Sequence, residues 1–197
     1  MEHCLHVPEA VMTRTIWTPT LAWLAAVSAA LVFAVAGPNE SSLMGRLPTL
    51  AAKRPDRQQV LLPQGLPAER TLALVGFRRS QRSEIQSWID GLRLEEDRTI
   101  SWLRMAVLND PGNEQAREAI EARISERTPS GVDRSRLVRV FTDRDAFVRA
   151  AGLSSAEHAW VLVLNRDGKV LARAEGAFDE DKARALRQTL LAQSSDF

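Results

Sequence analysis

One stretch of this chain, residues 160–176, constrains the fold most, because it encodes two strands joined by a tight turn. The run WVLVL at residues 160–164 is apolar throughout, which is typical of a strand buried on both faces of a sheet. The next four residues, Asn165 to Gly168, favour a turn and end on the residue that tolerates a positive φ. Small or apolar residues then recur at every second position over 170–174, which predicts a half-exposed second strand.

Upstream of this hairpin, strand and helix signals alternate from residue 70 onward. Apolar runs predict strands over residues 71–77, 100–108 and 137–141. Ser80 can cap the first helix, whose inner face is predicted to be Ile85, Trp88, Ile89 and Leu92. Later helical faces are marked by Ala116, Ile120 and Ile124, and by Phe147, Val148 and Ala151. The order β-α-β-α-β-α-β-β-α, with a last helix over 179–191, predicts an α/β fold with a parallel sheet, helices on both faces and an antiparallel hairpin at one edge.

The N-terminal region carries 25 uncharged residues between Arg14 and Glu40. About 20 apolar residues span a bilayer, but the run also closes on Ala-Val-Ala at 34–36, a signal-peptide cleavage pattern. We therefore expect residues 1–36 to be a signal peptide or an N-terminal membrane anchor. Export is favoured by the cleavage pattern, whereas the positive-inside rule would place the rest of a retained anchor in the cytoplasm.

Four prolines interrupt residues 38–63, and no helical period survives there. Residues 37–63 are accordingly predicted to form an extended tether, and residues 64–197 the folded domain. Lys and Arg number 26 against 25 Asp and Glu, with the signs interspersed, so no nucleic-acid footprint is expected. The only cysteine, Cys4, precedes the apolar run and excludes an intramolecular disulfide. His3, Cys4 and His6 lack a fourth ligand, so we expect no metal site.

The strand order and the hairpin carry a resemblance to a known fold. Residues 60–193 resemble the thioredoxin-like fold in its peroxiredoxin-type elaboration, with an apolar run, Asn-x-Asp-Gly, Lys-Val and a C-terminal helix. Residues 139–190 are similar to two families of this fold without an established thiol chemistry. These are the periplasmic YtfJ family and the mitochondrial ATP synthase assembly factor family. The resemblance implies a thioredoxin-like domain with a central mixed sheet.

The chain departs from redox members of that superfamily at two positions. Those members carry one or two cysteines between the first strand and the first helix, where the helix dipole lowers the pKa of the thiol. Here the junction reads Arg78-Arg79-Ser80-Gln81-Arg82. The cis-proline that precedes the hairpin in redox members is replaced by His158-Ala159-Trp160. Without a thiolate, disulfide exchange and peroxide reduction by that route are excluded.

The junction itself suggests a different kind of site. Arg78, Arg79, Ser80 and Arg82 can converge on a phosphate or carboxylate at a helix N-terminus. The alternative is that the arginines point into solvent or pair with acids such as Glu84. Ser80 as a nucleophile would need His158 as its base, and the sequence does not fix that distance.

Other polar and aromatic groups are interpreted as structural. The acidic runs at 95–97 and 179–181 are predicted to be solvated helix surfaces rather than metal sites. Trp88, Trp102 and Trp160 occupy apolar-face positions and are predicted to lie in the core. The sequence therefore assigns no catalytic residue, no metal site and no cofactor.

Two function classes follow. The first is a non-redox thioredoxin-like binding, accessory or assembly domain in the cell envelope, periplasmic or extracytoplasmic, whose partner is an envelope or membrane protein. An uncleaved N-terminal segment would anchor it in the inner membrane. The second is an enzyme of another type that uses the Arg79–Arg82 junction or the thiol of a redox partner. A binding domain should show an apolar patch away from the junction, and an enzyme a deep pocket at it.

Overall fold

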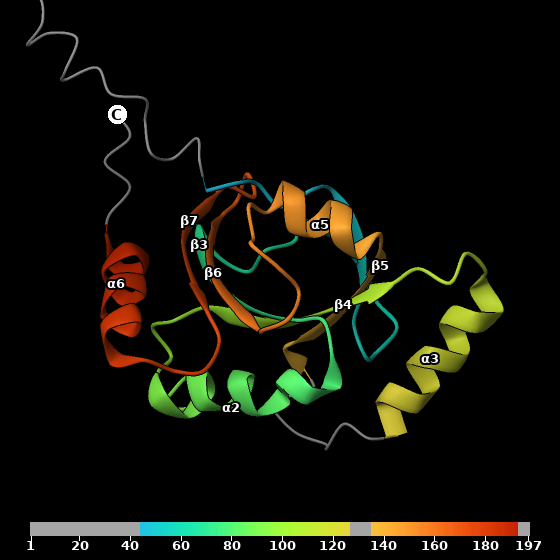
Figure 1. Ribbon diagram of the computed structural model, residues 1–197, viewed down its shortest axis with the longest axis horizontal. Coiled ribbons are helices and arrows are strands. Elements are labelled where there is room, and N and C mark those ends of the chain that lie inside the picture. Colours follow the sequence, from blue (N-terminus) through green and yellow to red (C-terminus); the bar gives the residue numbers. More distant parts are fainter. Residues whose placement is uncertain (1–43, 127–134, 193–197) are drawn as a thin grey trace, which may run out of the picture. The chain divides into compact units, whose positions relative to one another are not determined.

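The computed structural model describes residues 44–126 and 135–192 of the 197 in the chain. Figure 1 shows a sheet with helices on both sides. The elements run in the order β1 (Leu50–Lys53), β2 (Gln59–Leu62), β3 (Arg70–Gly76), the 3-10 helix η2 (Arg79–Gln81), α2 (Arg82–Gly91), β4 (Trp102–Asn109), α3 (Glu114–Glu126), β5 (Leu137–Thr142), α5 (Arg144–Ala150), β6 (Trp160–Asn165), β7 (Val170–Glu175) and α6 (Glu180–Leu191).

The seven strands form one mixed sheet in the order β2-β1-β5-β4-β3-β6-β7. The three central strands β3, β4 and β5 are parallel, because each is joined to the next by a helical crossover. On one side, β6 pairs antiparallel with β3 and with β7. The α/β fold, the mixed sheet and the C-terminal hairpin predicted from the sequence are confirmed.

The turn of the C-terminal hairpin forms where its residues predict it. The side-chain oxygen of Asn165 accepts hydrogen bonds from the backbone N–H of Asp167 at 3.1 Å and of Lys169 at 2.8 Å. Gly168 has φ +79°, and a side chain there would also meet the backbone oxygen of Leu47 at 3.1 Å. The positive φ of the turn therefore favours glycine, and the missing side chain leaves room for the backbone at Leu47.

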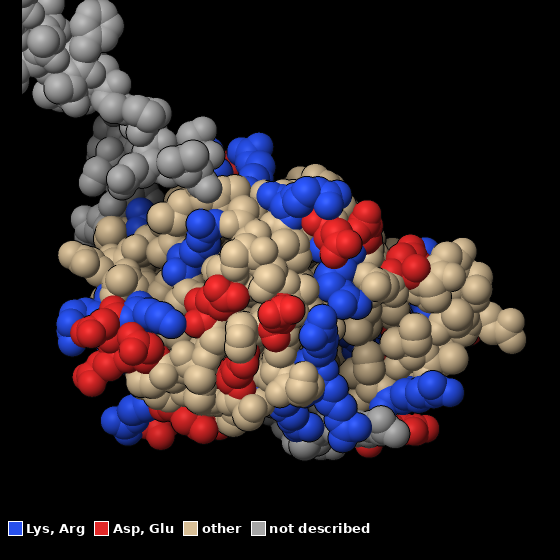
Figure 2. All heavy atoms as spheres, in the orientation of Figure 1, with Lys and Arg blue, Asp and Glu red and all other residues tan. Residues whose placement is uncertain are grey.

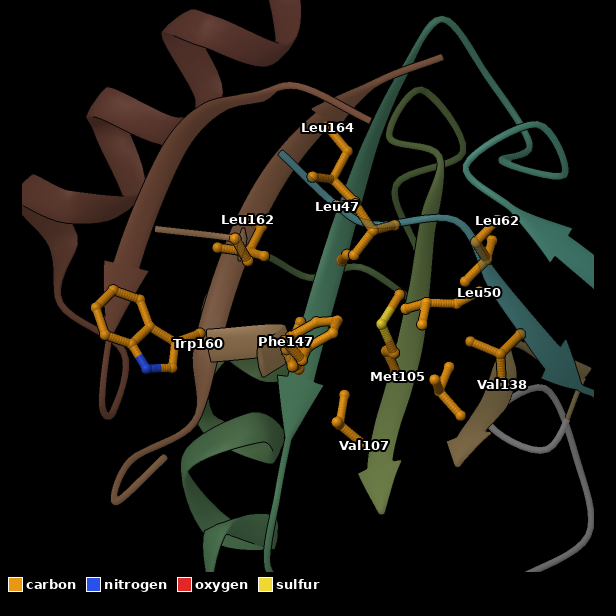
Figure 3. Packing of buried hydrophobic residues seen from close by; sticks show 14 of the residues in the cluster. Leu47, Leu50, Leu62, Met105, Val107, Val138, Phe147, Trp160, Leu162 and Leu164 are labelled. Carbon is orange, nitrogen blue, oxygen red and sulfur yellow. The ribbon is translucent and has the colours of Figure 1, made fainter. Parts of the chain in front are cut away.

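Each face of the sheet has its own hydrophobic cluster. On the α5 face, shown in Figure 3, Phe147 packs with side chains from β4, β5 and β6 and from residues 47–62. On the opposite face, residues of α2 and α6 pack on β3, β6 and β7. The predicted inner face of α2 is confirmed, because Ile85, Trp88, Ile89 and Leu92 are all buried there. The three tryptophans predicted for the core, Trp88, Trp102 and Trp160, are buried as well.

The predicted tether is wrong over residues 44–63. These residues belong to the folded unit of residues 40–197, where β1 and β2 form an antiparallel hairpin and β1 pairs with β5. The prolines do not break these strands, because Pro48 precedes β1, Pro55 lies in the turn and Pro63 follows β2. Leu47, Leu50 and Leu62 point into the core of the α5 face (Figure 3).

The rest of the predicted N-terminal organisation lies outside the described residues, including residues 1–36 and 37–43. Within residues 44–126 and 135–192, no helix combines the length and the apolar character needed to cross a bilayer. The unit of residues 40–197 contains all seven strands and both hydrophobic clusters. It therefore has what an independently folding domain needs.

Candidate functional site: an arginine-lined trough

A cavity of about 280 Å³ opens between α2, α3 and the carboxyl ends of β3 and β4. We call it the trough. It is lined by Leu74, Gly76, Phe77, Arg78, Arg79, Arg82, Ile85, Arg104, Met105, Ala106, Leu108, Arg123, Ile124 and Leu137. Figure 2 shows basic side chains gathered between the first turn of α2 and α3. The lining thus combines an apolar floor with five arginines.

The topology of the sheet explains why the trough exists. Right-handed crossovers from β3 to β4 and from β4 to β5 place α2 and α3 on the same face. The buried side of α2 packs toward β3 and β6, whereas α3 is tied to β1 by an ion pair of 3.1 Å between Lys53 and Glu121. The two helices diverge, and β4 between them stays partly uncovered.

The burial of the side chains of β4 shows that one side of this strand is only partly covered. Leu103, Met105 and Val107 are buried in the cluster of the α5 face. Residues of the other parity point toward α2 and α3. Of these, Arg104, Ala106 and Leu108 are half-buried and line the trough.

The hollow in the floor is made by two small residues side by side. Gly76 of β3 is paired in register with Ala106 of β4. A side chain at position 76 would come within 2.9 Å of the Cδ1 atom of Ile85. Gly76 therefore leaves room for the tip of the Ile85 side chain, and Ala106 leaves the space beside it open.

The buried side chain of Gln81 fixes the junction that carries three of the arginines. Its Oε1 atom accepts hydrogen bonds from the backbone N–H of Phe77 at 2.7 Å and of Arg78 at 3.1 Å. Its Nε2 atom donates to the backbone oxygen of Ala156 at 2.9 Å. This residue ties the end of β3 to the loop before β6, so the backbone of Arg78, Arg79 and Arg82 is held in place.

The junction arginines have no acidic partner among the described residues. Glu84, the acid in the first turn of α2 and the partner considered from the sequence, is used elsewhere. One of its oxygens lies 2.9 Å from Nδ1 of His158, and the other accepts from the backbone N–H of Ala159 at 2.6 Å. Among the residues that the structure describes, no Asp or Glu lines the trough. Clustered positive charge beside low-dielectric walls gives a strong local attraction for anions.

The sequence predicted three of these arginines and missed the other two. Arg78, Arg79 and Arg82 lie together at the trough, whereas Ser80 is exposed and is not part of its lining. Arg104 and Arg123 reach the trough from β4 and α3. The charge of Arg104 inside an otherwise apolar strand was the one signal that could have indicated it.

Ser80 is not the helix cap expected from the sequence. It lies inside η2, and α2 begins at Arg82 with Gln81 at the N-cap position. The carboxamide of Gln81 replaces the expected hydroxyl as the group that satisfies backbone N–H groups at this junction. Ser80 and His158 share no hydrogen bond in the described part of the chain, and His158 instead pairs with Glu84, whose hydrogen bond raises the pKa of the imidazole.

The acidic runs serve local structure. Asp179 caps α6 by accepting from the backbone N–H of Lys182 at 2.9 Å. Asp97 accepts from the backbone N–H and the hydroxyl of Thr99, and these bonds lower the pKa of its carboxyl group. Across residues 44–126 and 135–192, no group of three or more His, Cys, Asp or Glu is placed to hold a metal ion. The cluster of His3, Cys4 and His6 lies outside the described residues.

Comparison with solved structures identifies the fold. A candidate electron-transfer protein from Aquifex aeolicus VF5 superposes with a TM-score of 0.52 at 12% identity, over 78% of this chain and 96% of that protein. BsSco, a member of the Sco family of cytochrome c oxidase assembly proteins, gives 0.51 at 14% identity, over 77% of this chain and 96% of its own. The fold of this chain is thioredoxin-like. No family model and no curated protein matches the sequence. At these identities the likeness establishes the fold alone.

In thioredoxin-like terms, the trough opens at the junction where redox members carry their thiols. Arg78 to Arg82 occupy that junction here, and residues 5–197 contain no cysteine. The peptide bond before Trp160, where redox members have a cis-proline, is not cis; within the described residues the cis bond is Leu62–Pro63.

Proposed function

We propose that this chain is a non-redox, thioredoxin-like binding domain that acts as an accessory to an envelope or membrane protein. The observation that carries the proposal is the arginine-lined trough at the junction where thiol members of the fold react. The proposed location outside the cytoplasm rests on the apolar N-terminal segment with its Ala-Val-Ala ending. Sco, a structural neighbour, is an assembly protein, which supports an accessory role by fold analogy.

The trough favours binding over the alternative enzyme. A cavity does lie at the junction, where an enzyme of this fold was expected to have one. However, the described side chains that line it are apolar or are arginines, and none of these supplies a carboxylate, imidazole, hydroxyl or thiol. Guanidinium groups stay protonated near neutral pH and are poor proton-transfer groups. The described lining can hold an anion, but it offers no nucleophile or general base.

Thiol activity provides the first test. Insulin reduction and peroxide consumption by residues 40–197 should equal the buffer rate, because that part of the chain has no cysteine. Turnover above that rate by a metal-free sample would overturn the non-redox part of the proposal.

The binding role requires a comparison of variants. A pull-down from membranes with the full chain should recover a partner that Arg79→Gln/Arg82→Gln loses. The control Arg98→Gln/Arg149→Gln removes the same charge from exposed positions outside the trough. Equal recovery by both double variants would mean that the trough is not the partner site.

The envelope location requires a separate test. A reporter enzyme that works only outside the cytoplasm, fused after Phe197, should be active. Activity only from a reporter that works in the cytoplasm would contradict export.

A further inference from the structure

We infer that the trough binds a small amphiphilic anion, a carboxylate or phosphate joined to an unbranched apolar chain. This inference rests on the proposed binding function and adds the chemical class of the ligand. Three properties of the trough carry it: an apolar floor, charges that flank that floor, and a volume close to that of small-molecule sites.

The apolar floor favours a ligand that has an apolar part as well as an anionic group. Ala106, Leu108 and Ile124 line the trough and are half-exposed, although each is apolar. A phosphate or sulfate ion would leave these side chains in water. An alkyl chain would cover them and gain about 25 cal/mol for each Å² of apolar surface removed from water.

The charges lie on both sides of the hollow floor. Arg78 follows Gly76 by two residues, and Arg104 precedes Ala106 by two residues, while Gly76 and Ala106 are register partners. Two residues of strand span about 7 Å. Both arginines line the trough. The guanidinium group of Arg78 can bind a carboxylate or phosphate through paired hydrogen bonds, and Arg104 adds positive charge at the other end of the hollow.

The volume of the trough is that of a small-molecule site. Its 280 Å³ lies near the lower limit of such sites, which begin at about 300 Å³. One alkyl chain with a single anionic head group is a ligand of that size. A peptide helix laid over the trough is the competing occupant, and the titration below includes a peptide that tests it.

The test is calorimetric titration of residues 40–197 with ligands of graded chain length. The probes are acetate, butyrate, hexanoate and octanoate, then octyl phosphate and inorganic phosphate, with octyltrimethylammonium as the matched cation. We expect Kd to fall about tenfold for every two methylene groups along the carboxylate series until the trough is filled. The octanoate and octyl phosphate arms show which head group is preferred.

Variants separate the apolar contribution from the ionic one. Ala106→Leu fills the hollow and should weaken octanoate at least tenfold while leaving inorganic phosphate unchanged. Leu108→Gln, at a half-exposed position, is a second variant that removes apolar contact without adding volume. Arg79→Gln/Arg82→Gln should weaken every anion. Ala146→Leu, at a half-buried alanine of α5 outside the trough, should change none of these affinities.

Each alternative outcome has a definite meaning. If acetate binds as tightly as octanoate, the amphiphile inference is wrong and the trough is a simple anion site. If octyltrimethylammonium binds as tightly as octanoate, the head group is not recognised and the inference is also wrong. A capped acidic helical peptide that outbinds octanoate and is unaffected by Ala106→Leu would replace the small ligand with a peptide. Absence of binding by any anion would instead refute the trough as the binding site of the proposed function.

Discussion

The sheet face that carries α2 has two halves that differ in how completely helices cover them. In the closed half, α2 and α6 cover β3, β6 and β7, and Trp88 is fully buried there. Its ring meets Phe178 edge-on at 5.2 Å, and its Nε1 atom donates to the backbone oxygen of Gly176 at 2.8 Å. In the open half, α2 and α3 diverge over β4, and Ala106 and Leu108 stay half-exposed.

The two halves use similar apolar residues for different purposes. In the closed half, the apolar side chains are completely buried, and their removal from water stabilises the fold. In the open half the same kind of surface is left beside arginines, and exposed apolar surface of this sort marks interaction sites. The spacing of the covering helices, more than the composition of the strands, decides which half is fully buried and which half keeps apolar surface exposed.

The largest expected effect tests whether stability comes mainly from the closed half. Trp88→Ala should lower the free energy of unfolding by about 3–5 kcal/mol, because it removes a fully buried ring. Leu108→Ala in the open half should cost less than about 1 kcal/mol, since that side chain is already partly in water. Urea unfolding of residues 40–197 measures both. Equal costs would show that the trough is part of the core.

The next effect concerns the junction between the halves. Gln81→Ala should cost about 1–3 kcal/mol, because the buried N–H of Phe77 and the oxygen of Ala156 lose their partner. It should also weaken anion binding, since Arg78 and its neighbours lose their fixed backbone. Gln86→Ala removes an exposed hydrogen bond to Asp90 and should change stability by less than about 0.5 kcal/mol. Unchanged anion affinity in Gln81→Ala would refute the positioning role.

A smaller effect of opposite sign is expected from the arginines of the open half. Arg79→Ala/Arg82→Ala should stabilise the anion-free protein slightly, by about 0.3–1 kcal/mol, because positive charge beside a helix N-terminus is unfavourable. Thermal melts with and without millimolar phosphate measure this. Phosphate should raise the melting temperature of the wild type more than that of the double variant. A wild-type melting temperature that phosphate does not move would remove the anion site.

Most of the closed half could be predicted from the sequence, because its signals are local. The apolar run at residues 160–164 and the spacing of Ile85, Trp88, Ile89 and Leu92 each specify one element and one buried face. The β1–β2 hairpin could not be predicted in this way. Its strands are four residues long, and β1 is held by pairing with β5, more than 80 residues later in the chain. The prolines at the ends of these strands give the segment the proline-rich composition that is typical of a linker.

The candidate site was predictable only in part, for a similar reason. Arg78, Arg79 and Arg82 are neighbours in the sequence, so their charges could be seen as a cluster. Arg104 and Arg123 join them only through the divergence of α2 and α3, which depends on contacts between distant elements. The spacing of Ala116, Ile120 and Ile124 predicts a helical face, but does not show that this face stays half-exposed.

The smallest effect is a pH dependence of the folding stability, which should come from the pair His158–Glu84 and should not involve the trough. The hydrogen bond that the imidazole of His158 donates to the Glu84 carboxylate raises the pKa of His158 above its ordinary value of 6.5. A raised pKa in the folded state means that the stabilisation is complete below pH 6.5 and is lost as the pH rises through the folded value. Glu84→Gln should therefore lower the pKa of His158 toward 6.5 and flatten the fall in stability above that pH.

Histidine NMR gives a direct measurement, because His158 is the only histidine in residues 40–197. The control is Glu157→Gln, which removes a weaker charge contribution and should lower the pKa of His158 less than Glu84→Gln does. Octanoate affinity should be the same in Glu84→Gln and in the wild type, because Glu84 is not part of the trough lining. A large change in that affinity would show that the two halves are coupled through the first turn of α2, and the division between a stabilising half and a binding half would then fail at Glu84.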